Sequence, residues 1–323
     1  MDKSIKAAIL IVILGLLSAM LLAGCDTSGG GGADQVSEPS PEAPSLPTAP
    51  PVYSIPEFPL PSASGTNVEE NDKATIDFSN MSDGYVMARF REDTNGQIRA
   101  ILNYPDGTEY TYRLTSDGDF GVFPLSGGNG EYGVRVFEQI DGSRYALALS
   151  ATIDVVLTDE FAPFLRPNQF VDFNRDSEAV RKAAELAAGV DGLMDIVSVI
   201  YHFVTTNIEY DFELAQTVQS GYVPDVDNVL MRGRGICFDF ASVMAAMLRS
   251  QGIPTKLVIG YVGEAYHAWI SVFSAETGWI DDIISFDGVH WTLMDPTFAS
   301  SANPAEMMSY IGDGTNYRPM FMH

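Results

Sequence analysis

The hydrophobic pattern of this chain changes its period near residue 160, and that change limits the folds the chain can adopt. Between residues 75 and 158, apolar and polar residues alternate in short runs, as they do in half-buried strands. Most runs are separated by Asn-Gly or Asp-Gly pairs, which favour tight hairpin turns. From residue 176 onward, apolar residues recur at helical spacing. The sequence therefore predicts an α+β protein with two folded parts.

The first folded part, residues 75–160, is predicted to be an antiparallel β-sandwich. Six short strands at near-regular spacing favour that architecture. We expect them at residues 84–90, 98–104, 108–114, 119–125, 131–140 and 144–157. Residues 75–158 contain no histidine or cysteine, so this part is predicted to be a spacer or a binding module without a catalytic site.

The N-terminus has the pattern of an export signal. Lys3 and Lys6 precede an uncharged, mostly apolar run that ends at Gly24. The last four residues before the composition changes, Leu-Ala-Gly-Cys25, resemble a bacterial lipobox. The resemblance implies that residues 1–24 are removed and that Cys25 carries a lipid. An uncleaved membrane anchor is the alternative. Either way, we expect the folded parts to be extracytoplasmic and held at the membrane.

Residues 25–74 are predicted to be a tether. They include four consecutive glycines and half of the 18 prolines of the chain, with little aliphatic content to bury. The whole chain has 18 basic and 43 acidic residues, a formal net charge of −25. Such a charge repels phosphate backbones and anionic headgroups, so nucleic acid is excluded as an expected partner.

The second folded part, residues 161–323, begins with a connector at 161–173 and a helix capped by Asp176 or Ser177. A further helix follows Asp191 and contains His202, which is interpreted as structural. The stretch GRGICFDFASVMAAMLRSQGIPTK, residues 233–256, comes next. Its helix ends at Gly252 and places Cys237 in the first turn, where unpaired amides favour a thiolate. Asp239 opposes that effect.

Three strands are predicted after this helix, at residues 255–262, 266–273 and 289–296. His267 and Trp269 share one face of the second strand, and Asp295 lies on the third. If the second and third strands pair, the imidazole and the carboxylate can lie side by side. The helix of Cys237 is expected to pack against that same face.

Cys237, His267 and Asp295 together supply what a cysteine acyl-transfer centre requires. The thiol needs an imidazole to take its proton, and the imidazole needs a carboxylate to orient it. Alternatives remain for each: Cys237 as a buried apolar residue, His290 as the base, and Asp295 as a turn cap. Asp281, Asp282 and Asp287 are interpreted as a solvated acidic turn rather than a calcium loop. No metal or cofactor is expected.

Several motifs in order make the chain resemble the transglutaminase-like superfamily. They are Gly-Arg-Gly-Ile-Cys237-Phe-Asp-Phe-Ala, Met247 to Pro254, Tyr266-His267-Ala-Trp269, Trp291 to Asp295-Pro-Thr, and Ile208-Glu-Tyr210-Asp. The resemblance implies a papain-like α+β core with Cys237 as nucleophile, His267 as base and Asp295 as orienting acid. Tyr210 is a candidate for the oxyanion hole.

The resulting hypothesis is an envelope-anchored cysteine acyl-enzyme that attacks peptide or glutamine carboxamide carbonyls. Water would make it protease- or amidase-like, and an amine would make it transamidating. Its expected substrates are envelope proteins or peptides. The alternatives are a non-catalytic surface lipoprotein that binds peptide or glycan, and an architectural protein with the sandwich as an adhesive.

Overall fold

The computed structural model describes residues 53–281, 285–286, 291–292 and 317–323. The predicted leader, Cys25 and the first half of the predicted tether lie outside these residues. The described residues belong to one compact unit, Pro50–His323, and they form an α+β protein, as the sequence predicts. The boundaries expected for the two folded parts stay predictions.

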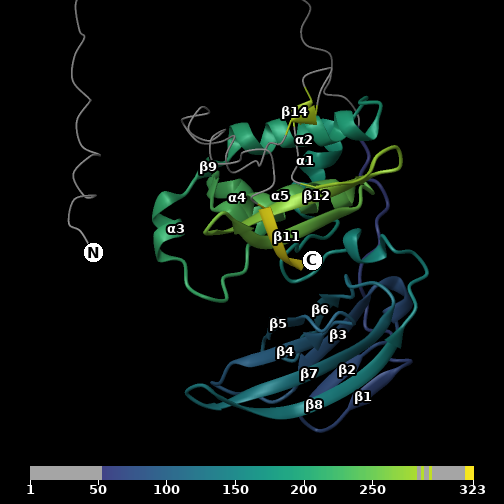
Figure 1. Cartoon of the computed structure of the whole chain (residues 1–323), viewed down its shortest axis with the longest axis vertical. Coiled ribbons are helices and arrows are strands. Elements are labelled where there is room, and N and C mark those ends of the chain that lie inside the picture. The colour runs from purple at the N-terminus through teal and green to yellow at the C-terminus, as the bar shows by residue number, and fades with distance from the viewer. Residues whose placement is uncertain (1–52, 282–284, 287–290, 293–316) are drawn as a thin grey trace, which may run out of the picture. The chain divides into compact units, whose positions relative to one another are not determined.

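The N-terminal part is a β-sandwich of two four-stranded antiparallel sheets (Figure 1). One sheet has the order β1-β2-β3-β6 and the other has the order β5-β4-β7-β8. The strands are β1 (Val68–Glu70), β2 (Ala74–Asp77), β3 (Tyr85–Phe90), β4 (Ile98–Asn103), β5 (Glu109–Leu114), β6 (Gly121–Pro124), β7 (Gly130–Asp141) and β8 (Arg144–Val155). The short helix η1 (Met81–Asp83) precedes β3.

Alternation along the strands builds the core of the sandwich. In β5, every second residue is buried, so Tyr110, Tyr112 and Leu114 point into one cluster with residues of both sheets. Phe90 and Phe123 of the opposite sheet are fully buried in that cluster. The period-two pattern therefore predicts these six strands to within about two residues at each end, which is its usual precision.

The structure differs from the sequence prediction at the end of the predicted tether. Phe58 is 5% exposed and its ring centroid lies 5.3 Å from that of Phe173. The edge strand β1 and the buried start of β2 also fall before residue 75. A proline-rich composition hides these features, because one aromatic residue and two short strands suffice to hold the segment.

The second part packs five α-helices, one short 3-10 helix and a four-stranded sheet of order β13-β12-β11-β16 among the described residues (Figure 1). The helices are η2 (Ala162–Phe164), α1 (Glu178–Ala187), α2 (Leu193–Asn207), α3 (Phe212–Thr217), α4 (Val226–Arg232) and α5 (Cys237–Ser250), with η2 the 3-10 turn. The strands are β9 (Glu209–Tyr210), β10 (Arg234–Gly235), β11 (Thr255–Val262), β12 (Ala265–Ser274), β13 (Gly278–Ile280), β14 (Ser285–Phe286), β15 (Trp291–Thr292) and β16 (Tyr317–Met322). Helix α5 contacts α1, α2 and α4 and also strands β11 and β12.

Strand β12 has a partner that sequence analysis did not predict. Its residues Val272–Ser274 pair with β13, which is only three residues long and therefore shows no clear period-two pattern. Trp291–Thr292, the described residues of the expected third strand, pair with Ser285–Phe286. Pairing between the second and third expected strands stays a prediction, because residues 293–296 lie outside the described part of the chain. Trp279 of β13 packs against Phe164 and lies 3.7 Å, centroid to Nζ, from Lys256.

Strand β16, which sequence analysis missed, joins the two parts of the fold. It pairs with β11 and continues into His323, whose amide and carbonyl both bond Leu257 at 2.8 Å. On its other side, the Met322 amide donates to the Tyr110 hydroxyl at 3.0 Å. The His323 ring lies 3.0 Å, Nδ1 to Oη, from Tyr112. One short strand thus has partners in the helical part and in the sandwich.

Arg249 near the end of α5 reinforces this junction. Its side chain is fully buried and donates to the carbonyls of Thr255, Arg166 and His323 at 2.6–2.9 Å. Burial lowers the pKa of its guanidinium to about 9, which leaves the group charged at neutral pH. The buried charge is therefore satisfied by backbone dipoles from three separate segments.

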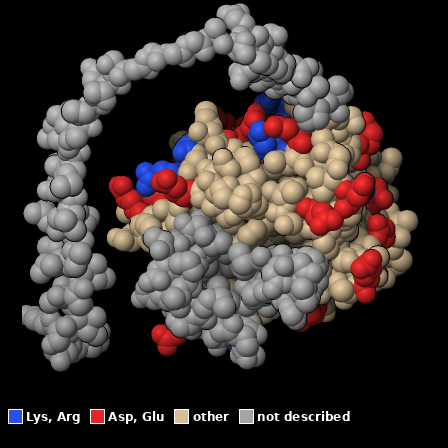
Figure 2. All heavy atoms as spheres, turned by 90° about the horizontal axis from the view of Figure 1, so that it is seen from above, with Lys and Arg blue, Asp and Glu red and all other residues tan. Residues whose placement is uncertain are grey.

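Acidic side chains dominate the described surface, as the net charge predicts. Figure 2 shows them in several patches, with few basic side chains on the same face. Among the helices of the described residues, none is long and apolar enough to cross a membrane. The apolar run that ends at Gly24 lies outside those residues.

We predict that His323→Phe becomes progressively more stable than the wild type as the pH falls from 7 to 5. Burial, aided by the nearby Arg249 charge, lowers the pKa of His323 to about 3. Between pH 3 and its ordinary value near 6.5, the unfolded chain binds a proton that the folded chain excludes, so the wild type loses stability as the pH falls. Urea unfolding should show a relative gain of about 1 kcal/mol per pH unit below 6. A difference that stays constant between pH 7 and pH 5 contradicts this account.

Candidate active site

The start of α5 defines the candidate active site. Helix α5 begins at Cys237, with Ile236 as N-cap, and the thiol is free and half-buried. The first amides of a helix lack intrahelical partners, so donors are available beside this thiol. Sequence analysis places Cys237 in the first turn, and the structure makes it the first helical residue.

Two glycines shape the backbone before the thiol. Gly233 ends α4 in the left-handed conformation, with φ of 62°. A Cβ atom at Gly235 would lie 2.6 Å from the Cβ of Asp239, a distance that real side chains do not tolerate. Gly235 is therefore required so that the chain can turn closely back onto the first turn of α5.

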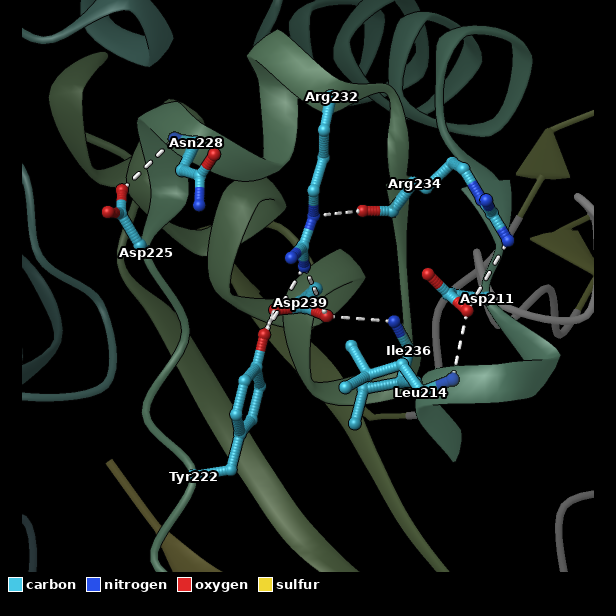
Figure 3. Close-up of polar contacts among 9 residues, drawn as sticks. All are labelled: Asp211, Leu214, Tyr222, Asp225, Asn228, Arg232, Arg234, Ile236 and Asp239. Atoms are coloured by element: carbon cyan, nitrogen blue, oxygen red, sulfur yellow. Dashed lines mark hydrogen bonds and ion pairs between the residues drawn. The ribbon is translucent and has the colours of Figure 1, made fainter. Parts of the chain in front are cut away.

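A short parallel pairing places Tyr210 beside this turn. Strands β9 and β10 pair with Tyr210 opposite Gly235, and the Asp211 amide donates to the Gly235 carbonyl at 2.8 Å. The side chain of Asp211 then caps α3 by accepting from the Leu214 amide, and it lies 3.4 Å from Arg234 (Figure 3). Tyr210 therefore pairs with Gly235, the residue two positions before Cys237. The role of Tyr210 in the oxyanion hole stays a prediction.

A carboxylate locks the first turn of α5. The Asp239 side chain is fully buried and accepts from the Ile236 amide at 2.8 Å and the Tyr222 hydroxyl at 2.7 Å. Arg232 Nη2 lies 3.2 Å from Oδ2, the oxygen that also accepts from Ile236, and Arg232 Nε donates to the Arg234 carbonyl at 2.7 Å. Figure 3 shows these three donors converging on the carboxylate. The arrangement is half of a capping box, because Ile236 offers no side-chain acceptor in return.

The electrostatics of this cluster answer a question raised by the sequence. Burial raises the pKa of the Asp239 carboxyl, while the bonds from Tyr222 and Ile236 and the charge of Arg232 lower it. Burial and the bond to Asp239 raise the pKa of Tyr222 to about 12, so its hydroxyl stays a donor at neutral pH. Three donors, from Tyr222, Ile236 and Arg232, bind the Asp239 carboxylate. Its negative charge is therefore partly compensated and opposes a Cys237 thiolate less than an unpaired carboxylate would.

His267 lies on the strand that packs against α5, but the face differs from the expectation. Ala268, Ile270 and Val272 pack with α5 in the main core, so they form the face toward the helix. Trp269 belongs to a cluster on the other face, and His267 stacks near it with ring centroids 6.2 Å apart. His267 and Trp269 share a face, as predicted, but the expectation that α5 packs against that face was wrong, because two apolar sets alternate along β12 and either could have met the helix.

Tyr266, the residue before His267, lies at the tip of β12. Its side chain is 60% exposed and pairs with Tyr261 across β11 and β12, with ring centroids 5.4 Å apart. Burial of part of its ring is the largest cause that raises the pKa of Tyr266, followed by Tyr261 and Cys237.

Other candidates can be placed only in part. Asp295, His290, Asp282 and Asp287 lie outside the described residues, so the orienting acid and the alternative base stay predictions. His202 is exposed on α2. Within residues 53–281 and the shorter described segments, no cluster of three or more His, Cys, Asp or Glu side chains could hold a metal ion.

Sequence analysis placed Arg232 and Arg234 near the thiol but missed Tyr222 and the contact between Arg232 and Asp239. Tyr222 lies in an irregular segment without periodicity, and no motif identifies the partner of Arg232. The signal available was Asp239 itself, an acidic residue at the third position of a helix that is otherwise apolar. Such a residue implies buried donors nearby.

Part of the chain is similar in sequence to known proteins. Residues 181–296 match the model of the transglutaminase-like superfamily, a segment that includes Cys237, His267 and Asp295. Over 124 residues the chain is 29% identical to the uncharacterized protein YebA of Bacillus subtilis, covering 32% of this chain but only 17% of that protein.

Solved structures that align with the chain share little sequence with it. A crystal structure of a "Putative Cysteine Protease" from Cytophaga hutchinsonii aligns with 72% of this chain and 73% of its own, at 16% identity and a TM-score of 0.37. Red sea bream transglutaminase aligns with 67% of this chain and 48% of its own, at 13% identity and a TM-score of 0.26.

The class of the second folded part follows from the family match. Over residues 181–296 it is similar to the transglutaminase-like superfamily. The chain therefore carries a transglutaminase-like domain over residues 181–296, preceded by a β-sandwich.

We predict that Gly235→Ala destabilises the protein and slows alkylation of Cys237. The new Cβ would overlap Asp239, and relief requires the first turn of α5 to move, at a cost of about 1–3 kcal/mol. Urea unfolding and iodoacetamide labelling, quantified on the Cys237 peptide, measure both effects. Gly133→Ala is the matched control, because its Cβ would meet Asn103 at an ordinary 3.6 Å. Equal behaviour of the two variants contradicts the role given to Gly235.

Proposed function

We propose that this protein is a cysteine acyl-enzyme in which Cys237 attacks a peptide or glutamine carboxamide carbonyl. His267 takes the thiol proton and delivers it to the leaving amine, and Asp295 orients the imidazole. The single observation that supports this proposal most is the position of Cys237 as the first residue of α5, inside the transglutaminase-like segment.

The structure around the thiol suits each step of this chemistry. The helix start supplies unpaired amides and a partial positive charge, which favour the thiolate and a tetrahedral oxyanion. Helix α5 packs against β12, and His267 lies near the start of that strand, on the face that carries Trp269. The half-buried thiol leaves one side open to a carbonyl, while the core behind it is closed.

The acyl-thioester can be resolved by water or by an amine, and both outcomes use the same three side chains. We favour hydrolysis, so the reaction is protease- or amidase-like. We further propose that the protein acts on envelope proteins or peptides while anchored by lipid at Cys25. The Leu-Ala-Gly-Cys25 sequence and the proline-rich tether support that location.

We predict that Cys237→Ala abolishes covalent labelling by a carboxamide-derived acyl probe. His267→Ala should lower turnover by about 10³-fold or more, because the thiol then lacks its proton acceptor. Ammonia release and peptide cleavage, followed together on a small peptide library, report the acyl-enzyme and its acceptor.

His202→Ala is the control for His267→Ala, since His202 is exposed on α2 and lies on no element of the site. His290→Ala separates the alternative base from the proposed one. The proposal fails if wild-type protein and Cys237→Ala label equally, and that result would favour a non-catalytic binding module.

A further inference from the structure

The β-sandwich reaches the start of α5 through one of its edge strands, β5. Arg113 of β5 donates from its guanidinium to the carbonyl of Gly221 at 3.3 Å. Gly221 has φ of 84°, and a Cβ atom there would lie 3.0 Å from Arg113 Nε. The loop that precedes α4 is thus shaped to bring its backbone against a side chain of the sandwich.

The residue after Gly221 is Tyr222, the hydroxyl donor to Asp239 at 2.7 Å. Asp239 in turn holds the Ile236 amide, one residue before the thiol. Polar contacts therefore run from β5 through the 221–222 backbone to the N-cap of α5. Figure 3 shows the last part of this path, from Tyr222 to Ile236.

An apolar path runs from the same strand to the same helical turn. Tyr112 of β5 stacks on Phe170, with ring centroids 5.6 Å apart. Phe170 contacts Phe238, the residue after Cys237, at 5.4 Å. The connector that holds Phe170 is itself fixed to β5, because the Gln169 side chain pairs with both the amide and the carbonyl of Arg113.

We propose that strand β5 of the sandwich positions the first turn of α5, so that Arg113 and Tyr222 are positioning residues for the Cys237 thiol. The polar path from Arg113 ends at Ile236, and the apolar path from Tyr112 ends at Phe238, so the two paths reach the residues on either side of Cys237. A domain that acted only as a spacer would need neither path. The expected effect on turnover rests on the proposed function. The expected effect on the chemical reactivity of the Cys237 thiol does not.

The experiment compares Arg113→Ala, Tyr222→Phe and their double variant with the wild-type chain. Tyr222→Phe removes one hydrogen bond to a charged acceptor, so iodoacetamide alkylation of Cys237 and kcat should each fall about fivefold. Arg113→Ala should lower both about threefold. KM should stay within about twofold, because neither residue contacts substrate. The double variant should match Tyr222→Phe alone, since both changes break one path.

Arg99→Ala is the matched control. Arg99 is on the neighbouring strand β4 and lies over the Tyr145 ring at 4.2 Å, so its loss perturbs the sandwich without touching the 221–222 loop. Arg113→Gln provides a second, milder variant, and all rates are taken well below each unfolding midpoint.

Two results overturn the inference. One is that Arg113→Ala and Arg113→Gln alkylate Cys237 as fast as Arg99→Ala does. The other is that the effects of Arg113→Ala and Tyr222→Phe multiply in the double variant, which would make them independent. A wild-type chain that never forms an acyl-enzyme refutes the proposed function instead, and the alkylation comparison still decides this inference.

Discussion

The burial of helix α5 is the constraint on which the rest of the structure depends. Every residue from Asp239 to Ser250 is buried, between α1, α2 and α4 on one side and β11 and β12 on the other. A helix enclosed in this way cannot slide or rotate without disturbing the whole core. The buried residues that follow Cys237 in α5 therefore fix the position of the helix. Only the conformation of its first turn depends on local contacts.

Each end of this helix carries a buried charge that is satisfied by groups from distant segments. Asp239 draws in Tyr222, Arg232 and the Ile236 amide, and Arg249 draws in three backbone segments. Removing one partner of such a charged group costs more folding free energy than the interaction itself contributes, because the remaining polar atom is then buried and unpaired. The charges therefore act mainly to select one arrangement of the segments around α5.

The sequence predicts much of this fold, and the failures have physical causes. Alternation and turn residues locate six of the eight strands of the sandwich, and glycine with helical spacing locates α5. The strands β13 and β16 escape because they are short or have no periodic context. The face of β12 was misassigned because a strand buried on both sides carries two apolar sets. Long-range partners such as Tyr222 and Asp239 follow from tertiary packing, which no local pattern encodes.

The sandwich is where sequence and structure differ most in what they imply about function. Its sequence contains no reactive side chain, and that absence suggested a spacer. Yet chemistry at a thiol depends on the position of its helix as much as on the thiol, since small displacements are costly for acyl transfer. Strand β16 bonds to the sandwich at Tyr110 and to β11, while β5 contacts the loop and the connector beside the first turn. A domain without reactive groups can therefore contribute to catalysis through the backbone that it holds in place.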